Sequence, residues 1–134
     1  MRITIRNLVA LTLLLVTTAA LAGDNKSNKY IVGGGVGGVD CPQFASAMSR
    51  AKTQGIGSVG YANETYGFTM YVLGFQTAYN LQTKDTCDIF GNFSTDQLLA
   101  WLDNYCQANP LQKFGSAVIA LAQEIYGNRV RSCQ

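Results

Sequence analysis

The chain has 134 residues, with ten Lys and Arg, eight Asp and Glu and no His, and its net charge at pH 7 is +2. Its sparse, mixed charges exclude the basic stripe typical of nucleic-acid-binding proteins. A chain without His lacks the commonest general base, any Ser-His-Asp or Cys-His arrangement and any His metal ligand. We therefore expect no enzyme activity, no cofactor, no bound metal and no nucleic-acid partner.

The first 22 residues have the three parts of a secretory signal peptide. Arg2 and Arg6 form a basic start, an apolar run covers residues 8–16, and Ala20 and Ala22 stand where a signal peptidase cuts. We expect cleavage after Ala22 and a periplasmic or secreted product. No stable membrane anchor should remain, because the apolar run is shorter than a span of about 20 residues. Cleavage would leave 112 residues, the size of one domain, with eight basic and eight acidic side chains.

Residues 23–39 are polar at first and then rich in glycine. Gly33, Gly35 and Gly38 match the G-x-G-x-x-G spacing of a dinucleotide-binding loop. That motif also needs a βαβ unit and an acidic residue about 20 positions further on, and the sequence predicts neither. We therefore interpret 23–39 as a flexible arm in front of a single helical domain, 40–134.

The first helix is predicted over residues 40–53. Asp40 is a favourable N-cap, Pro42 suits the first turn and Gln43 could complete a capping box. Its inner face follows helical spacing and consists of Phe44, Ala47, Met48 and Ala51.

A second helix is predicted from Asn63 or Glu64 to Leu81, after a stretch interrupted by glycines. It is apolar on nearly all sides, which is typical of a buried helix, so we expect it to be the central one. One face carries Tyr66, Met70, Leu73, Gly74, Thr77 and Leu81, and another carries Phe68, Tyr71, Phe75 and Tyr79. The alternative is that an aromatic face is exposed to a protein partner. The candidate contacts under this alternative are Tyr66, Phe68, Tyr71, Phe75, Tyr79 and Trp101, whereas the first interpretation places them in the core.

Two further helices follow a loop that ends near Phe93. Ser94 and Gln97 form a capping box that predicts the third helix. Asn109 and Pro110 fit the N-cap and first position of a fourth helix, which Gly127 would end. The inner face of this helix consists of Phe114, Ala117, Val118, Leu121 and Ile125. Because no segment alternates as a strand does, the sequence predicts a compact all-α, four-helix domain.

Four cysteines, Cys41, Cys87, Cys106 and Cys133, lie in the expected mature chain. An even number in a small exported protein indicates two disulfides, with three pairings open. Structural zinc sites, the alternative, usually contain closely spaced cysteine pairs, which this chain lacks.

A remaining alternative is a small secreted enzyme that uses carboxylates. Asp85 and Asp88 lie in one polar loop around Cys87, and Glu64 lies near the start of the second helix. This hypothesis requires a cleft that contains Glu64 or Asp88.

Three stretches, "VDCPQF", "YVLGF" and "WLDNYCQANP", resemble the HdeA/HdeB family of small periplasmic proteins. The resemblance implies an all-α bundle, a non-enzymatic holdase role for clients that unfold in acid, and a Cys41–Cys106 disulfide. Cys87 and Cys133 would then form the second disulfide.

The later part of the chain is also similar to the Tai-type immunity proteins of type VI secretion. The similarity rests on "YVLGFQTAY", on Cys87, on the stretch from Ser94 to Tyr126 and on the terminal Cys133. It implies a small exported helical protein that neutralises a toxin. Both resemblances predict a protein partner, either a client or a toxin, and homodimerisation is also open.

Overall fold

The computed structural model describes residues 30–133, and the chain from Val32 onward forms one compact unit. Its helices are η2 (Gly35–Gly38), α1 (Cys41–Thr53), α2 (Val59–Gln82), α3 (Thr95–Ala108), α4 (Phe114–Glu124) and η3 (Tyr126–Asn128). Over residues 30–133, β-pairing is limited to two isolated bridges. The all-α, four-helix prediction is confirmed, whereas the signal peptide predicted at 1–22 lies outside the described residues.

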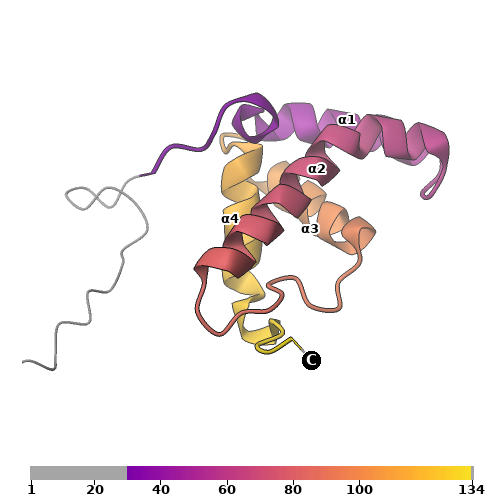
Figure 1. Cartoon of the computed structure of the whole chain (residues 1–134). Helices are drawn as coiled ribbons and strands as arrows, with labels where there is room; N and C mark the ends of the chain where they lie inside the picture. Colours follow the sequence, from indigo (N-terminus) through magenta and orange to yellow (C-terminus); the bar gives the residue numbers. More distant parts are fainter. Residues whose placement is uncertain (1–29, 134) are drawn as a thin grey trace, which may run out of the picture. The chain divides into compact units, whose positions relative to one another are not determined.

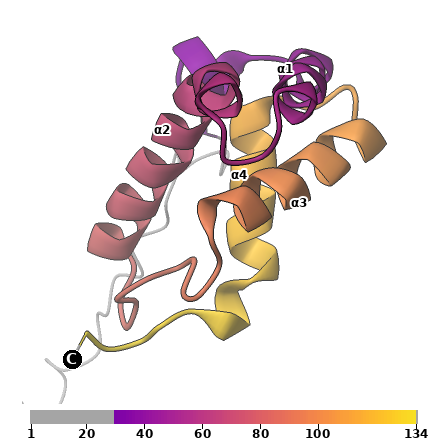
Figure 2. The ribbon, with the colours of Figure 1, turned by 90° about the vertical axis from the view of Figure 1, so that its right-hand side faces the viewer.

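The four α-helices pack through a small set of contacts. α1 lies across one end of the unit and packs against both α2 and α3, while α3 also packs against α4 (Figure 1). After a quarter turn, α4 runs between α2 on one side and α3 on the other (Figure 2). Of the helices described here, none combines the length and hydropathy that a membrane crossing requires.

The core is built around the ring of Phe114, the first residue of α4. This ring lies 4.5 Å from that of Phe44 in α1 and 5.0 and 5.7 Å from those of Phe68 and Tyr71 in α2, measured between centroids. Such tilted and edge-on aromatic pairs each add about 0.5–1.5 kcal/mol beyond the burial of their area. The predicted inner faces of the first and fourth helices are confirmed, because all nine side chains are buried.

A short backbone pairing joins the start of α1 to the start of α4. The amide of Cys41 donates to the carbonyl of Gln112 at 3.0 Å, and the amide of Phe114 donates to the carbonyl of Val39 at 2.8 Å. Between these bonds Asp40 forms an ion pair with Lys113. Asp40 therefore occupies the predicted N-cap position, but its side chain makes no capping bond and the predicted box with Gln43 does not form.

Both disulfides implied by the family resemblance are present. Cys41–Cys106 ties the first residue of α1 to α3 inside the core, where both sulfur-bearing residues are buried. Cys87–Cys133 ties the loop after α2 to the C-terminal tail. The second bridge is supported by Val130, whose amide and carbonyl pair with Asp88.

The predicted start of the second helix is wrong by several residues, because α2 begins at Val59 with Ser58 as its N-cap. Gly55 and Gly57 have positive φ angles and form the turn before it. Gly60 belongs to the helix itself, where a Cβ would lie 2.9 Å from the side chain of Gln54.

The predicted start of the fourth helix is also wrong. Asn109 closes α3 instead, since its side-chain amide donates to the carbonyl of Tyr105 at 2.9 Å. The following residues form a turn, and Lys113 precedes α4 as its N-cap residue. The capping box of α3, formed by Ser94 and Gln97, is confirmed.

The glycine-rich segment is packed against the helices, although the sequence predicts an arm that reaches Val39. Gly37 in η2 is buried, and a Cβ there would lie 2.5 Å from the ring of Tyr71. A Cβ at Gly115 would overlap Val32 and would lie 3.0 Å from the carbonyl oxygen of Gly37. The small residues thus allow the segment to lie directly on α2 and α4, while residues 23–29 lie outside the described part.

Replacing Gly115 with Ala should lower the free energy of unfolding by about 2 kcal/mol, because the added methyl group has no free space. Gly74→Ala is the matched control. A Cβ at Gly74 meets no atom within 4 Å, so this substitution should raise the free energy of unfolding by about 0.5–1 kcal/mol through helix propensity. Urea unfolding of both variants measures the two signs. An unchanged Gly115→Ala variant would contradict the packing of Val32 and Gly37 on α4.

The two disulfides should differ in their reactivity toward a mild reductant. Cys133 is exposed, whereas Cys41 and Cys106 are both buried in the core. We therefore expect dithiothreitol to open Cys87–Cys133 in the folded protein and Cys41–Cys106 only on unfolding, because a thiolate must reach the sulfur that it attacks. Alkylation followed by peptide mass mapping measures the order. Equal rates for both bridges would contradict it.

Candidate functional site

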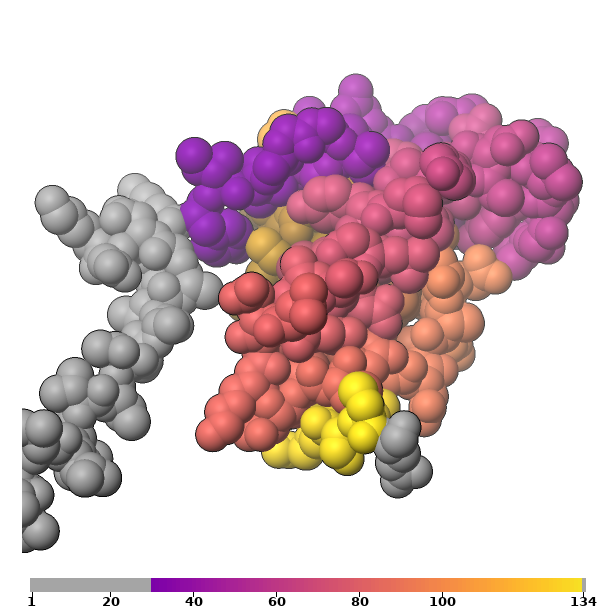
Figure 3. Space-filling model, in the orientation of Figure 1, coloured from indigo at the N-terminus to yellow at the C-terminus, as the bar shows by residue number. Residues whose placement is uncertain are grey.

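The outward side of α2 is the candidate partner-binding surface. Of the 24 residues of α2, only Glu64 is charged. The side chains that point away from the core recur every three or four positions, and we call them the outer face of α2. They are Val59, Ala62, Tyr66, Met70, Leu73, Thr77 and Leu81. In the space-filling view α2 crosses the front of the unit, so its surface is open along the helix (Figure 3).

Several apolar side chains on this face are strongly exposed. Val59 is 78% exposed, Tyr66 66% and Leu81 79%. Only Tyr61, Thr65 and Val72 of the whole helix are buried. The expectation that the second helix is central and buried all round is therefore wrong: α2 lies at the surface and buries one side only.

The predicted contact residues fall on opposite sides of this helix. Tyr66 lies on the outer face, whereas Phe68, Tyr71, Phe75 and Tyr79 are half-buried and pack against the core. The sequence pattern predicts both faces but does not indicate which one is turned outward, because both are apolar. Met70 and Val59 are also exposed, and they extend the surface beyond the aromatic residues that are predicted as partner contacts.

The sixth predicted contact, Trp101, lies away from α2 on the side of α3. Its ring stacks on Tyr105 with centroids 5.2 Å apart, and its indole N–H donates to Glu124 of α4 at 3.1 Å. Since Trp101 also packs against the core, we assign it a structural role between α3 and α4.

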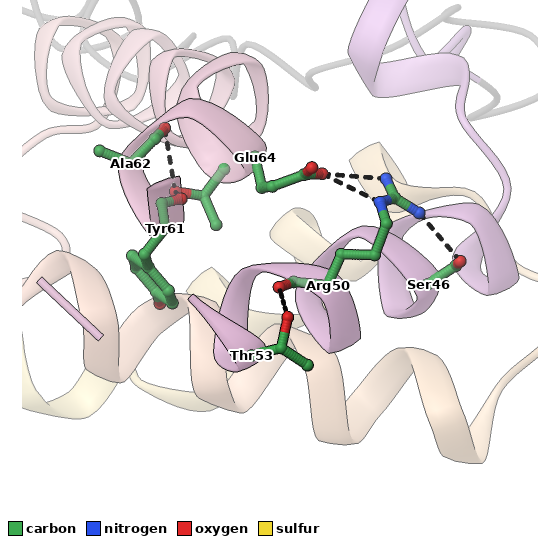
Figure 4. Close-up of polar contacts among 7 residues, drawn as sticks. Ser46, Arg50, Thr53, Tyr61, Ala62 and Glu64 are labelled. Carbon is green, nitrogen blue, oxygen red and sulfur yellow. Dashed lines mark hydrogen bonds and ion pairs between the residues drawn. The ribbon is translucent and has the colours of Figure 1, made fainter. Parts of the chain in front are cut away.

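Glu64 is engaged at the junction of α1 and α2. Its Oε2 accepts from Nε of Arg50 at 3.1 Å and lies 3.0 Å from Nη2, while Nη1 of Arg50 donates to Ser46 (Figure 4). Glu64 therefore turns toward α1 and leaves the outer face of α2 without a charge.

A pocket of about 290 Å³ lies between the first half of α2 and the start of α3. It adjoins the outer face of α2, since Ala62 and Tyr66 belong to both. Its other lining residues carry mainly hydroxyl groups and small side chains, with one carboxylate, and are Gly57, Ser58, Tyr61, Thr65, Thr69, Thr95, Asp96 and Leu99.

Local hydrogen bonds hold the α2 side of this pocket. Ser58 accepts from the amide of Tyr61 at 3.0 Å, and the hydroxyl of Thr65 donates to the carbonyl of Tyr61 at 2.9 Å. Burial raises the pKa of the Tyr61 phenol above its ordinary value of 10.0, and the charge and hydrogen bonding of Asp96 raise this pKa further. The charge of Asp103 acts on the pKa in the same direction.

Asp103 is a buried carboxylate on α3 whose ion pair with Lys52 holds α1. Its Oδ2 bonds to the Lys52 ammonium, whereas its Oδ1 has no hydrogen-bond partner among the described residues. Lys52 itself is exposed. This pair fixes α1 against α3 and keeps a negative charge close to Tyr61.

Of the carboxylates that the enzyme hypothesis names, Asp88 lines an open surface hollow beside Cys87 and Cys133, whereas Glu64 lies at the junction of α1 and α2. Asp88 accepts from the side chain of Gln76 at 2.6 Å and from the amide of Phe90 at 3.0 Å, and Glu64 is bound to Arg50. Asp85 is exposed. In the part of the chain that the structure describes, no three His, Cys, Asp or Glu side chains come together as a metal site would require.

Comparisons with protein-family models, with curated proteins and with solved structures give no match to this chain.

The raised pKa of Tyr61 predicts how stability falls in alkali. The folded protein favours the neutral phenol, and this preference contributes to the free energy of unfolding. The contribution is complete below pH 10 and is lost as the pH rises through the higher folded-state pKa. The difference in absorbance at 295 nm between the unmodified protein and Tyr61→Phe reports the ionisation of this phenol, and its midpoint should lie above pH 10. The fall in the free energy of unfolding above pH 10 should also be shallower in Tyr61→Phe. A midpoint at or below 10 would contradict the burial of this hydroxyl beside Asp96.

Proposed function

We propose that the chain is a non-catalytic, exported protein-binding domain, HdeA/HdeB-like, that acts in the periplasm as a holdase for protein clients. The bound protein lies on the outer face of α2. The observation that carries this proposal is an uncharged apolar face along a 24-residue helix at the surface of the unit. Contiguous exposed apolar surfaces of this kind mark interaction sites on small proteins. The two disulfides are typical of proteins in oxidising, exported compartments.

The charges near the outer face favour a different protein over a second copy of the chain. Asp96 lines the pocket beside this face, and no residue of the face is basic. In a second copy, the outer face itself would supply no positive charge opposite Asp96. A protein that offers a cation there would complement the surface in charge as well as in polarity.

A response to acid is supported by the way in which α1 is held. Three ion pairs join its segment to the other helices: Asp40–Lys113 to α4, Arg50–Glu64 to α2 and Lys52–Asp103 to α3. Ion pairs of this kind lose their attraction in strong acid, where carboxylates no longer carry a negative charge. α1 then remains attached through Cys41–Cys106, while the apolar surfaces that it covers become accessible to clients.

The holdase proposal is tested by light scattering from an acid-unfolding client protein at pH 2–3 and at pH 7. We expect the oxidised protein to suppress aggregation at pH 2–3 and to release the client on neutralisation. An absence of protection in acid would overturn the holdase assignment.

The second candidate is an immunity protein that neutralises a type VI secretion effector. This candidate is favoured because the outer face of α2 is exposed while all three ion pairs are intact. No acid step is therefore needed to uncover the face. It predicts a defined 1:1 complex at pH 7 with a toxin encoded by a neighbouring gene, measured by light scattering coupled to size-exclusion chromatography. Dimerisation of the chain through α2 in the same experiment would contradict a heterologous partner.

Placing charge on the outer face should abolish binding without unfolding the protein. In the double variant Met70→Glu and Leu81→Glu, a bound partner would bury two unpaired carboxylates, so we expect at least ten-fold weaker client protection or toxin binding. Because both side chains are exposed, the free energy of unfolding should change by less than about 1 kcal/mol.

The matched control is Gln107→Glu with Gln123→Glu, two exposed positions on α3 and α4. It adds the same charge away from α2 and should bind like the unmodified protein. Equal loss in both double variants would show that net charge, and not the outer face of α2, governs binding.

A further inference from the structure

We infer that the pocket between α2 and α3 receives an arginine side chain of the protein that binds along the outer face of α2. This inference rests on the proposed function, because the pocket and the outer face share Ala62 and Tyr66. A protein lying on the face therefore passes over the pocket, and one of its side chains can enter.

The size of the pocket suits one long side chain. Its volume of about 290 Å³ lies just below the range of small-molecule sites, which span about 300–1,000 Å³. An extended arginine can place its alkyl stem against the methyl groups of Ala62 and Thr65 while its head group remains near the polar side.

The charge of the pocket selects a cation. Asp96 is the only charged residue in its lining. Among the described residues no lysine or arginine forms an ion pair with Asp96, whereas Asp40, Glu64 and Asp103 each have one. An anionic ligand would be repelled from this place.

The shape and chemistry of the lining favour guanidinium over ammonium. Tyr66, which is exposed, supplies an aromatic ring on which a planar guanidinium can stack. The Asp96 carboxylate in the lining can accept a forked pair of N–H groups. Thr69 and Thr95 add hydroxyl oxygens that can accept the remaining donors.

The test is a ¹H–¹⁵N NMR titration of the oxidised protein, expressed from the whole chain, with Nα-acetyl-arginine amide. The control ligand is Nα-acetyl-citrulline amide, which has the same length and no charge. We expect saturable shifts of the Ser58, Tyr61, Thr69 and Asp96 amides with the arginine compound and at least ten-fold weaker binding of citrulline. Binding of the arginine compound should weaken as NaCl is raised from 50 to 500 mM.

Asp96→Asn should lower the affinity for the arginine compound at least ten-fold, because it removes the charge and keeps the shape. Asp85→Asn, an exposed carboxylate in a distant loop, is the matched control and should bind normally. The spectra themselves report whether each variant is folded. Equal binding of citrulline, equal binding by Asp96→Asn, or shifts confined to residues outside the pocket would overturn the inference.

The same proteins separate this inference from the proposed function. If Met70→Glu with Leu81→Glu abolishes partner binding but the arginine compound never enters the pocket, the pocket assignment fails alone. If the compound binds and partner binding survives charges on the outer face, the proposed function fails while the pocket remains a guanidinium site.

Discussion

The junction between the segment Val39–Cys41 and the segment Gln112–Phe114 holds the structure together. Two backbone hydrogen bonds, the Asp40–Lys113 ion pair and the Cys41–Cys106 disulfide lie within a few residues of one another. They fix the first turns of α1 and α4 and a late turn of α3 at a single place. The ring of Phe114 starts from this junction and meets rings from α1 and α2. Because a disulfide restricts mainly the unfolded chain, the bridge stabilises a junction whose native bonds are few.

The role of α2 follows from that frame. The other three helices meet at the junction, whereas α2 joins through the rings of Phe68, Tyr71 and Phe75, which face inward. Large rings hold the helix at the edge of the core and use only one of its sides. The opposite side is then left at the surface with side chains that would suit a core. Since Glu64 is bound to Arg50, no charge interrupts that side. The helix is thus apolar all round for two separate reasons, one of them packing and the other, in our proposal, binding.

The limits of sequence-based prediction can be traced to individual residues. The helix class, the α3 capping box and the inner faces of α1 and α4 followed from local patterns, and the structure has all of them. The pair Asn109 and Pro110 predicts too early a start for α4. A long-range backbone pairing with Val39 and Cys41 holds the preceding residues outside the helix, which begins at Phe114. The two faces of α2 were visible in the sequence, but their orientation depends on where Phe114 and Phe44 lie. The pocket at Asp96 joins two helices distant in sequence, and no local pattern marks it.

The glycine-rich segment connects this frame to the candidate surface. Gly37 and Gly115 leave space for the ring and hydroxyl of Tyr71, and that tyrosine lies on the inner side of α2. Gly67 of α2 is also close to the segment, since a Cβ there would lie 3.3 Å from Val36. Larger side chains at these places would push α2 away from α4, and the cover over Phe114 would open. The glycines therefore help to set how far α2 stands from the core. The same spacing governs how its outer face and the pocket beside Tyr61 are presented to a protein that lies across both.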